Sequence, residues 1–322
     1  MSEVVAASCH VHGAGEAARL RRTWRPADGR SVRARIVLCH GTHEHSGRYD
    51  DFASLCCNGH GYECHAVDFR GHGRSAGERG DIGSLSGAVA DVIALVADVT
   101  TPPADTVPLV LMGHSLGSMV AFLAAHQLAT KASLPTPDMV IILGFAMDSI
   151  SPPFGIRQLV PVLRQMPAVV RAVTAALSTF QPQGPACPLP PAHELTSCAE
   201  AASATLRDPL HYHGWIQNRT ALALLDGRAQ CKAILPQWGA GFAFLLVHGE
   251  ADTLCPRSAC DALIAASPQR DKELKVFDGL RHEVLFEAHE QRESVHAHIL
   301  QWLEARIAGA ADAHLRRLRS RL

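Results

Sequence analysis

The chain is short of three things: charge of one sign, long apolar runs and aromatic side chains. Its 30 lysines and arginines offset 31 aspartates and glutamates, which leaves a formal net charge of −1. Without a basic excess the chain lacks the electrostatic footprint of a nucleic-acid binder, so we expect no nucleic-acid partner. Its apolar runs, such as 139–147, are far shorter than the roughly 20 residues of a membrane-spanning helix. Aromatic residues make up 5% of the 322 residues and hydrophobic residues 47%, which predicts an aliphatic core.

Paired cysteine motifs and an export signal are also missing. The ten cysteines occur singly apart from Cys56-Cys57, and none forms a C-x-x-C pair. The N-terminal residues show no positive patch followed by an apolar segment, as a secretory signal would. We therefore expect free thiols in a reducing compartment and a cytoplasmic location.

The chain does contain short apolar runs that alternate with helix-like segments. This alternation predicts an α/β fold with a mostly parallel central sheet flanked by helices. The expected strands are 36–39, 62–67, 109–112, 139–145, 242–247 and 274–277. The expected helices are 49–57, 87–99, 118–128, one from about 257, and 285–307.

The stretch 151–238 interrupts this alternation. It holds eleven of the nineteen prolines and no convincing buried strand, which predicts an inserted helical cap. Residues 1–150 and 239–308 would form the two parts of the sheet domain, and 309–322 a basic C-terminal tail. Ligands of open α/β sheets bind at the C-terminal edge of the strands, which such an insertion would cover.

The pentapeptide Gly-His-Ser-Leu-Gly at 113–117 directly follows an expected strand and precedes an expected helix. A sharp strand-to-helix turn exposes its central residue, and the two glycines remove side chains that would collide there. The amides that start the helix face any anion formed nearby. This context favours Ser115 as a nucleophile over a residue of an ordinary tight turn.

A serine nucleophile needs a base that takes its proton and an acid that orients the base. In α/β-hydrolases the chain order is serine, acid, histidine. Asp252 and His282 each follow an expected strand, so both would project from the same sheet edge as Ser115. Asp148, after strand 139–145, and Glu250 are alternative acids. We favour Asp252 because its loop immediately precedes the helix and strand that lead to His282.

An oxyanion hole needs two N–H donors aimed at the tetrahedral intermediate. The Leu116 amide would supply one of them. The other is expected from Thr42, because Gly41 beside it lets the backbone approach closely.

The segment His43-Glu44-His45 could suggest a zinc site. Its i, i+2 spacing on a loop differs from the i, i+4 histidine pair of helical zinc motifs. We therefore expect neither a metal nor another cofactor.

With these residues identified, the chain resembles the monoacylglycerol lipase and lysophospholipase-like family of α/β-hydrolases. The resemblance implies Ser115, Asp252 and His282 as the catalytic triad and the backbones of Thr42 and Leu116 as the oxyanion hole. The motifs that carry it are HGTHEHSGRY at 40–49, DFRGHGRS at 68–75, GHSLG at 113–117, DPL at 208–210, ADTLC at 251–255 and His282.

Substrate contacts are expected from residues in these motifs, namely Gly41, His43, Glu44, Arg48 and His114. The chain departs from the family at two positions. His43 stands where the family usually has a small residue, often glycine, and would narrow the site beside the oxyanion hole. Ser118 stands where a further glycine is common. Both departures leave the size of the substrate open.

Within the expected cap, apolar residues recur three and four apart between 156 and 177, with Arg157, Arg164 and Arg171 on the opposite face. Two prolines interrupt this amphipathic pattern. It suits either a cap that rests on a membrane surface or a helix that packs its apolar face on the domain. The residues of this face expected to contact substrate are Leu159, Leu163 and Met166.

The sequence therefore predicts a serine hydrolase that cleaves the ester bond of a monoacylglycerol or similar lysolipid through an acyl-enzyme, giving fatty acid and glycerol. Two alternatives stay open: a thioesterase or acyltransferase that uses the same triad, and a non-catalytic acyl-lipid-binding protein. The expected partner is a small lipid ester, with peripheral membrane contact through the cap. Fold-level resemblance fixes neither the substrate nor the oligomeric state.

Overall fold

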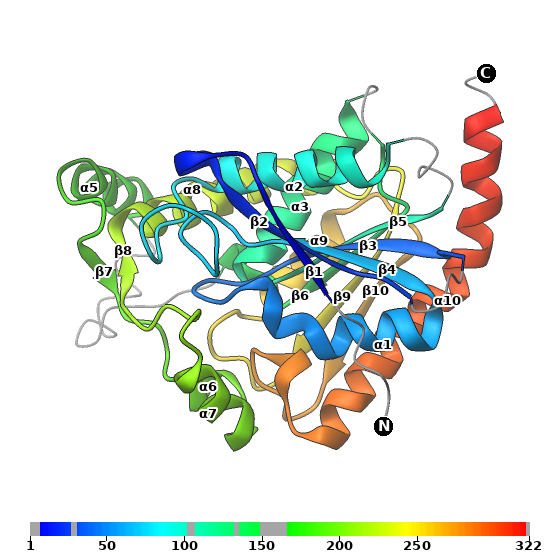
Figure 1. Ribbon diagram of the computed structural model, residues 1–322. Helices are drawn as coiled ribbons and strands as arrows, with labels where there is room; N and C mark the ends of the chain where they lie inside the picture. Colours follow the sequence, from blue (N-terminus) through cyan, green and yellow to red (C-terminus); the bar gives the residue numbers. More distant parts are fainter. Residues whose placement is uncertain (1–6, 27–30, 102–106, 132–134, 149–165, 320–322) are drawn as a thin grey trace.

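One eight-stranded sheet forms the centre of the protein (Figure 1). The computed structural model describes residues 7–26, 31–101, 107–131, 135–148 and 166–319. Neighbouring strands from β4 to β10 run parallel, whereas β1–β2 and β2–β4 are antiparallel pairs. In sheet order the strands are β1 (Ser8–His12), β2 (Arg19–Trp24), β4 (Tyr62–Val67), β3 (Ala34–Cys39), β5 (Leu109–His114), β6 (Met139–Leu143), β9 (Ala243–Gly249) and β10 (Lys272–Phe277).

Two aliphatic cores lie on the two faces of the sheet, because successive side chains of a strand point to opposite faces. In β6, Val140 and Ile142 join the first core, whereas Met139, Ile141 and Leu143 join the second. Continuous apolar strands of this kind are typical of a parallel sheet that is covered on both sides.

Helices provide that cover (Figure 1). The first core takes side chains from α2 (Leu85–Val99), α3 (Leu116–Thr130) and α9 (Ser258–Ala266). The second takes side chains from α1 (Asp50–His60) and α10 (His289–Arg319).

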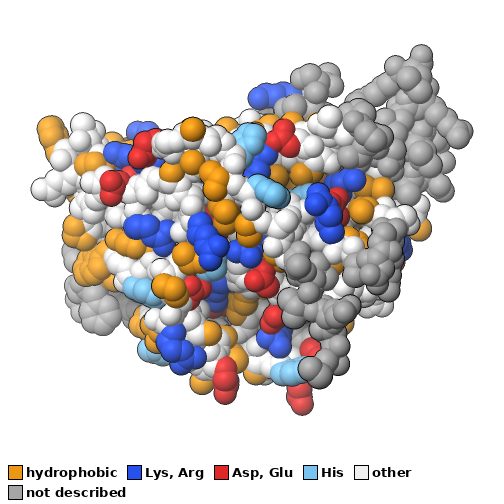
Figure 2. Space-filling view, viewed as in Figure 1, with side chains coloured by type: hydrophobic (Ala, Val, Ile, Leu, Met, Phe, Trp, Pro, Cys, Tyr) orange, Lys and Arg blue, Asp and Glu red, His pale blue; other side chains and the backbone are white. Residues whose placement is uncertain are grey.

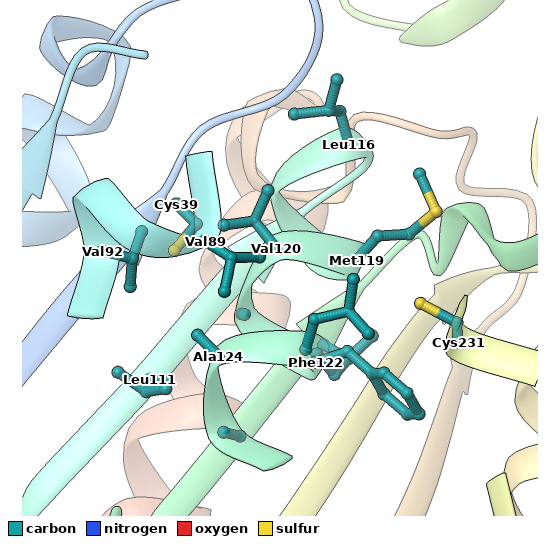
Figure 3. Packing of buried hydrophobic residues seen from close by; sticks show 14 of the residues in the cluster. Cys39, Val89, Val92, Leu111, Leu116, Met119, Val120, Phe122, Ala124 and Cys231 are labelled. Carbon is teal, nitrogen blue, oxygen red and sulfur yellow. The ribbon is translucent and has the colours of Figure 1, made fainter. Parts of the chain in front are cut away.

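Helix α3 is buried around most of its circumference. Its residues Met119, Val120, Phe122 and Ala124 lie in the first core together with Leu111 of β5 (Figure 3). The Phe122 ring also stacks on the Trp238 ring, with 4.3 Å between their centroids. A helix that is apolar on all sides is suited to the interior of a protein, which explains the central place of α3.

Residues 166–238, which lie between the neighbouring strands β6 and β9, are largely helical, and we call them the cap segment. Its last helix, α8, contributes Ala223, Leu224 and Cys231 to the first core, which ties the segment to the sheet domain. Its elements are α5 (Pro167–Phe180), β7 (Pro185–Cys187), α6 (Ala192–Leu195), α7 (Ala199–Arg207), β8 (Ile216–Gln217) and α8 (Asn218–Ile234).

The predicted α/β-hydrolase architecture and its six parallel strands are confirmed, and the two N-terminal strands were missed. Four of the five residues of β1 are exposed, and β2 carries three arginines around buried Leu20 and Trp24. Edge strands of this composition lack the apolar run by which the central strands were identified.

Both ends of the C-terminal helix also differ from the prediction. The C-terminal helix starts at His289, after a short 3-10 turn at Val284–Phe286, and continues to Arg319. Most of the predicted 309–322 tail is therefore helical. In the cap segment, α5 begins at Pro167, because proline is well tolerated at the first helical position. Across the part of the chain that the structure describes, no helix has the length and hydropathy needed to cross a membrane.

We predict that Gly117→Ala disrupts the packing of α3. A methyl group at this position would overlap the carbonyl oxygens of Cys39 and His40 at the end of β3. Overpacking against backbone commonly costs about 1–3 kcal/mol or more, so the melting temperature should fall by several degrees. Gly309→Ala is the control, because a methyl group at this exposed helical position meets nothing within 4 Å. Equal melting temperatures for the two variants would contradict the prediction.

Candidate active site

Ser115 lies at the turn that joins β5 to α3. Its backbone has φ 54° and ψ −122°, which a non-glycine residue adopts only when its surroundings hold it there. The Ser115 amide donates to the Leu143 carbonyl at 3.0 Å, which secures the turn to β6. A methyl group at Gly113 would overlap the Gly117 carbonyl, so the turn has no space for a side chain at position 113. The expected strand–turn–helix context of this serine is present.

Ser118, one of the two departures from the family pattern, supports the same turn. Its amide donates to the Ser115 carbonyl at 2.9 Å, and its hydroxyl donates to that carbonyl as well. The Ser118 hydroxyl also accepts from the Ala146 amide at 3.1 Å. Ser118 is fully buried and connects the turn to the loop after β6.

His282 and Asp252 meet beside this turn. His282 Nδ1 lies 2.8 Å from Asp252 Oδ2, and Asp252 Oδ1 accepts from the amides of Leu254 at 2.8 Å and Cys255 at 2.9 Å. Burial alone would raise the pKa of Asp252. The charge interaction with His282 and the hydrogen bonds from His282 and the Cys255 amide hold that pKa below its ordinary value. The carboxylate therefore stays ionised and keeps the Nδ1 proton on the histidine.

The second ring nitrogen of His282 is available for chemistry. His282 Nε2 is buried and has no hydrogen-bond partner among the described residues. A nitrogen in this state can accept a proton from a nearby hydroxyl, and such hydrogen bonds often tighten only when a ligand is bound.

The alternative acids lie elsewhere. Asp148 ends the 3-10 turn Ala146–Asp148, and its Oδ1 is 2.6 Å from Lys232 Nζ. Glu250 is exposed and accepts from the Gly279 amide at 3.4 Å. Of the three acids considered, Asp252 is the one that is hydrogen-bonded to His282.

A pocket has Ser115 and His282 in its wall. The expected oxyanion residues Thr42 and Leu116 also line it. Gly41 allows the loop after β3 to approach Ser115 closely, since a methyl group at position 41 would lie 3.2 Å from Ser115 Cβ and 2.8 Å from Glu44 Oε1. Of the other residues expected to contact substrate, the pocket lining includes Gly41, Glu44 and His114.

His43 and Arg48 are not in the lining of this pocket. His43 has φ 68° and is fully buried, and its ring makes an edge contact with the Tyr212 ring at 4.8 Å between centroids. The Tyr212 amide donates to the His43 carbonyl at 2.9 Å. The side chain of His43 therefore packs against the cap segment and does not narrow the described pocket.

Met166 is 46% exposed at the start of α5, and Leu159 and Leu163 lie outside the described residues.

A compact charged group supports the pocket beside Glu44. Arg48 donates to Glu44 and, through two nitrogens at 3.0 Å each, to both oxygens of Glu283. Burial alone would raise the pKa of Glu44, but Arg48 and a hydrogen bond with His114 hold it well below the ordinary value. Both glutamates thus share one guanidinium, so Arg48 balances one of the two carboxylate charges.

Sequence reasoning missed much of the pocket wall. The missed residues include His211 and Arg228 of the cap segment and Glu283 next to His282. Three of the missed residues had a nearby signal: His211 directly follows the 208–210 motif, Glu283 directly follows His282, and Leu254 lies within the 251–255 motif. The apolar members that were missed are Leu189, Leu195, Ile216, Leu224 and Leu254.

One group of possible metal ligands occurs among the described residues. Ligand atoms of Asp252, Cys255 and His282 lie within 4.8 Å of one another. This group coincides with the acid and base, whose atoms already share a hydrogen bond. His43, Glu44 and His45 do not converge, because His45 bonds Asp208 and Glu44 bonds Arg48.

Comparison with known proteins agrees with this arrangement. The model of the Hydrolase_4 family, described as serine aminopeptidase S33, matches residues 30–289. The monoacylglycerol lipase of Mycolicibacterium smegmatis is 32% identical, over 82% of this chain and 85% of that protein. The chain therefore belongs to the Hydrolase_4 family. A second relative of the hydrolase, the monoglyceride lipase of Rattus norvegicus, is 29% identical over 90% of this chain and 88% of that protein.

Solved structures show the same fold. A soluble variant of the monoglyceride lipase from Saccharomyces cerevisiae, in complex with a substrate analog, aligns with a TM-score of 0.79 at 19% identity. That alignment covers 95% of this hydrolase and 97% of the yeast chain. The monoacylglycerol lipase of Paleococcus ferrophilus aligns with a TM-score of 0.70 at 24% identity, over 88% and 97% of the two chains. The predicted membership of the monoacylglycerol lipase-like group is confirmed.

We predict that Asp252→Asn inactivates the hydrolase and that Asp148→Asn does not. An amide at position 252 cannot accept the Nδ1 proton as a carboxylate does, which favours the wrong tautomer of His282. The expected loss in kcat for Asp252→Asn is on the order of 10⁴, as for comparable triads. Asp148→Asn removes an acid that is paired with Lys232 and should leave kcat near wild type. A large loss of kcat in the Asp148 variant, together with normal kcat in the Asp252 variant, would reverse the assignment of the catalytic acid.

Proposed function

We propose that the hydrolase cleaves the ester bond of monoacylglycerols or similar lysolipids through an acyl-enzyme. The observation that carries the proposal is the hydrogen bond between His282 and Asp252, at 2.8 Å, in the wall of the pocket that also holds Ser115. The names of the relatives, monoacylglycerol lipase and monoglyceride lipase, support the choice of substrate. The apolar side of the pocket suits an acyl chain.

The proposed reaction assigns these groups the roles of a serine–histidine–aspartate triad. Ser115 Oγ attacks the acyl carbonyl while His282 Nε2 takes its proton, and Asp252 stabilises the imidazolium that forms. The amides of Thr42 and Leu116 donate to the oxyanion. His282 then returns the proton to the leaving alcohol, and water activated by the same nitrogen releases the fatty acid.

We propose that residues 151–238 act as the cap over this pocket and that α5 contacts a membrane surface. Along α5, apolar side chains at positions three and four apart are exposed, and Phe180 is the most exposed at 84%. Arg171 on another side of the helix pairs with Asp226 of α8 at 2.6 Å, which holds α5 in place. Helix α5 lies at the outer edge of the molecule (Figure 1), and hydrophobic side chains gather at that edge (Figure 2). The exposed stripe consists of Met166, Val169, Val173, Leu177 and Phe180.

A substrate profile tests the function. We predict that the wild-type protein hydrolyses monoacylglycerols with release of glycerol, and that Ser115→Ala removes this activity together with labelling by a fluorophosphonate probe. Faster cleavage of acyl thioesters, or transfer of the acyl group to an added alcohol, would favour the thioesterase or acyltransferase alternative. Absence of labelling and of turnover in a folded wild-type protein would instead indicate a binding protein.

Vesicle binding tests the exposed stripe. We predict that Val173→Ser with Phe180→Ser weakens sedimentation with phosphatidylcholine vesicles, because each apolar side chain withdrawn from water contributes about 1.5–3 kcal/mol. Hydrolysis of a short soluble ester should persist, since neither side chain lines the pocket. Val11→Ser is the control, because Val11 is 63% exposed on the edge strand β1. Equal vesicle binding by both variants and the wild type would exclude α5 as the contact.

A further inference from the structure

We propose that His211 binds a free hydroxyl on the alcohol part of the substrate and thereby selects esters of polyols. This inference rests on the function proposed above. It assigns to a cap residue a role in specificity that the motifs around Ser115 do not provide.

The position of His211 is fixed by its neighbours. Asp208 Oδ2 lies 2.7 Å from His45 Nε2, and the His211 amide donates to the Asp208 carbonyl at 3.2 Å. On the other side, the Tyr212 amide donates to His43, and Gln217 donates to the Tyr212 hydroxyl at 3.2 Å. The imidazole is therefore held in the pocket wall by contacts made by its neighbours and its own backbone.

The His211 ring contacts the His213 ring at 5.2 Å between centroids, but its Nδ1 atom is buried and lacks a hydrogen-bond partner among the described residues. A buried polar atom without a partner is uncommon in folded proteins and is explained when a ligand or water completes it. A pocket wall that also includes Ser115 and His282 is the place where the substrate can supply that partner.

The protonation state of His211 narrows the chemistry of the ligand. Burial, and next the positive charge of Arg48, lower the pKa of His211 to about 4. At neutral pH the ring is thus uncharged and offers one donor and one acceptor nitrogen. A hydroxyl, which both donates and accepts, matches either nitrogen.

The surrounding charges disfavour an anionic head group at this end of the pocket. Glu44 and Glu283 both line the pocket, and they share the guanidinium of Arg48. These three groups carry one more negative than positive charge, which repels a phosphate or carboxylate placed beside them. A neutral polyol such as glycerol avoids this repulsion and satisfies His211.

The test compares two esters of the same acyl chain, the glyceryl monoester and the methyl ester. The measured quantity is the ratio of kcat/KM for the glyceryl ester to kcat/KM for the methyl ester. In His211→Phe, which keeps the shape and loses both nitrogens, we expect this ratio to fall about tenfold, as for one lost buried hydrogen bond. Activity on the methyl ester should stay within about twofold of wild type. His211→Asn, whose amide can replace Nδ1, should retain most of the ratio.

The control is His193→Phe, which changes an exposed imidazole on α6 that neither lines the pocket nor contacts His211. It should keep the wild-type ratio, and thermal melting confirms that each variant is folded. If His211→Phe does not fold, the comparison of His211→Asn with His211→Ala carries the test. An unchanged ratio, or equal loss on both esters, in a folded and active variant would overturn the role of His211 alone. Failure of the wild-type protein to hydrolyse either ester would overturn the proposed function, and this inference with it.

Discussion

The close approach of α3 to the ends of β3 and β5 is the contact on which the site depends. Gly117 lies directly against the carbonyls of Cys39 and His40, and Gly113 lies against Gly117, so neither position has space for a side chain. This packing forces Ser115 into a left-handed conformation that costs about 1–3 kcal/mol. Burial of almost every side chain of α3 offsets that strain. A rigid nucleophile turn is therefore a consequence of core packing.

The cap segment is held to the sheet domain by the same loop that forms one side of the pocket. His45 bonds Asp208, His43 packs on Tyr212, and Arg79 donates to the Leu210 carbonyl at 2.6 Å. Burial, and next the neighbouring His72, hold the pKa of His43 well below its ordinary value, so its ring stays neutral in this contact. Residues 40–49 thus serve two purposes: Gly41 and Thr42 line the pocket with Ser115, whereas His43 and His45 position the cap segment.

Charge compensation divides the pocket into regions of different chemistry. Glu44 and Glu283 share the guanidinium of Arg48, which also lies over the Phe286 ring at 4.1 Å. Recognition of a substrate at that end is left to neutral polar groups such as His211 and the backbone amides. The leucines of the cap segment and the β9–α9 loop supply the apolar wall. An ester with an apolar acyl chain and an uncharged, hydroxylated alcohol fits this division.

The sequence alone determined the parallel strands β3 to β10, the order of Ser115, Asp252 and His282, and the loop of Thr42, because apolar runs and short motifs are local signals. It could not show the edge strands β1 and β2, because β1 is mostly exposed and β2 carries three arginines, so neither forms an apolar run. Only the tertiary structure decided that His282 bonds Asp252 while Asp148 pairs with Lys232. It also decided that His43 turns toward the cap segment while His211 enters the pocket wall. These outcomes depend on which loops meet at the edge of the sheet, and residue spacing along the chain carries no information about such distant contacts.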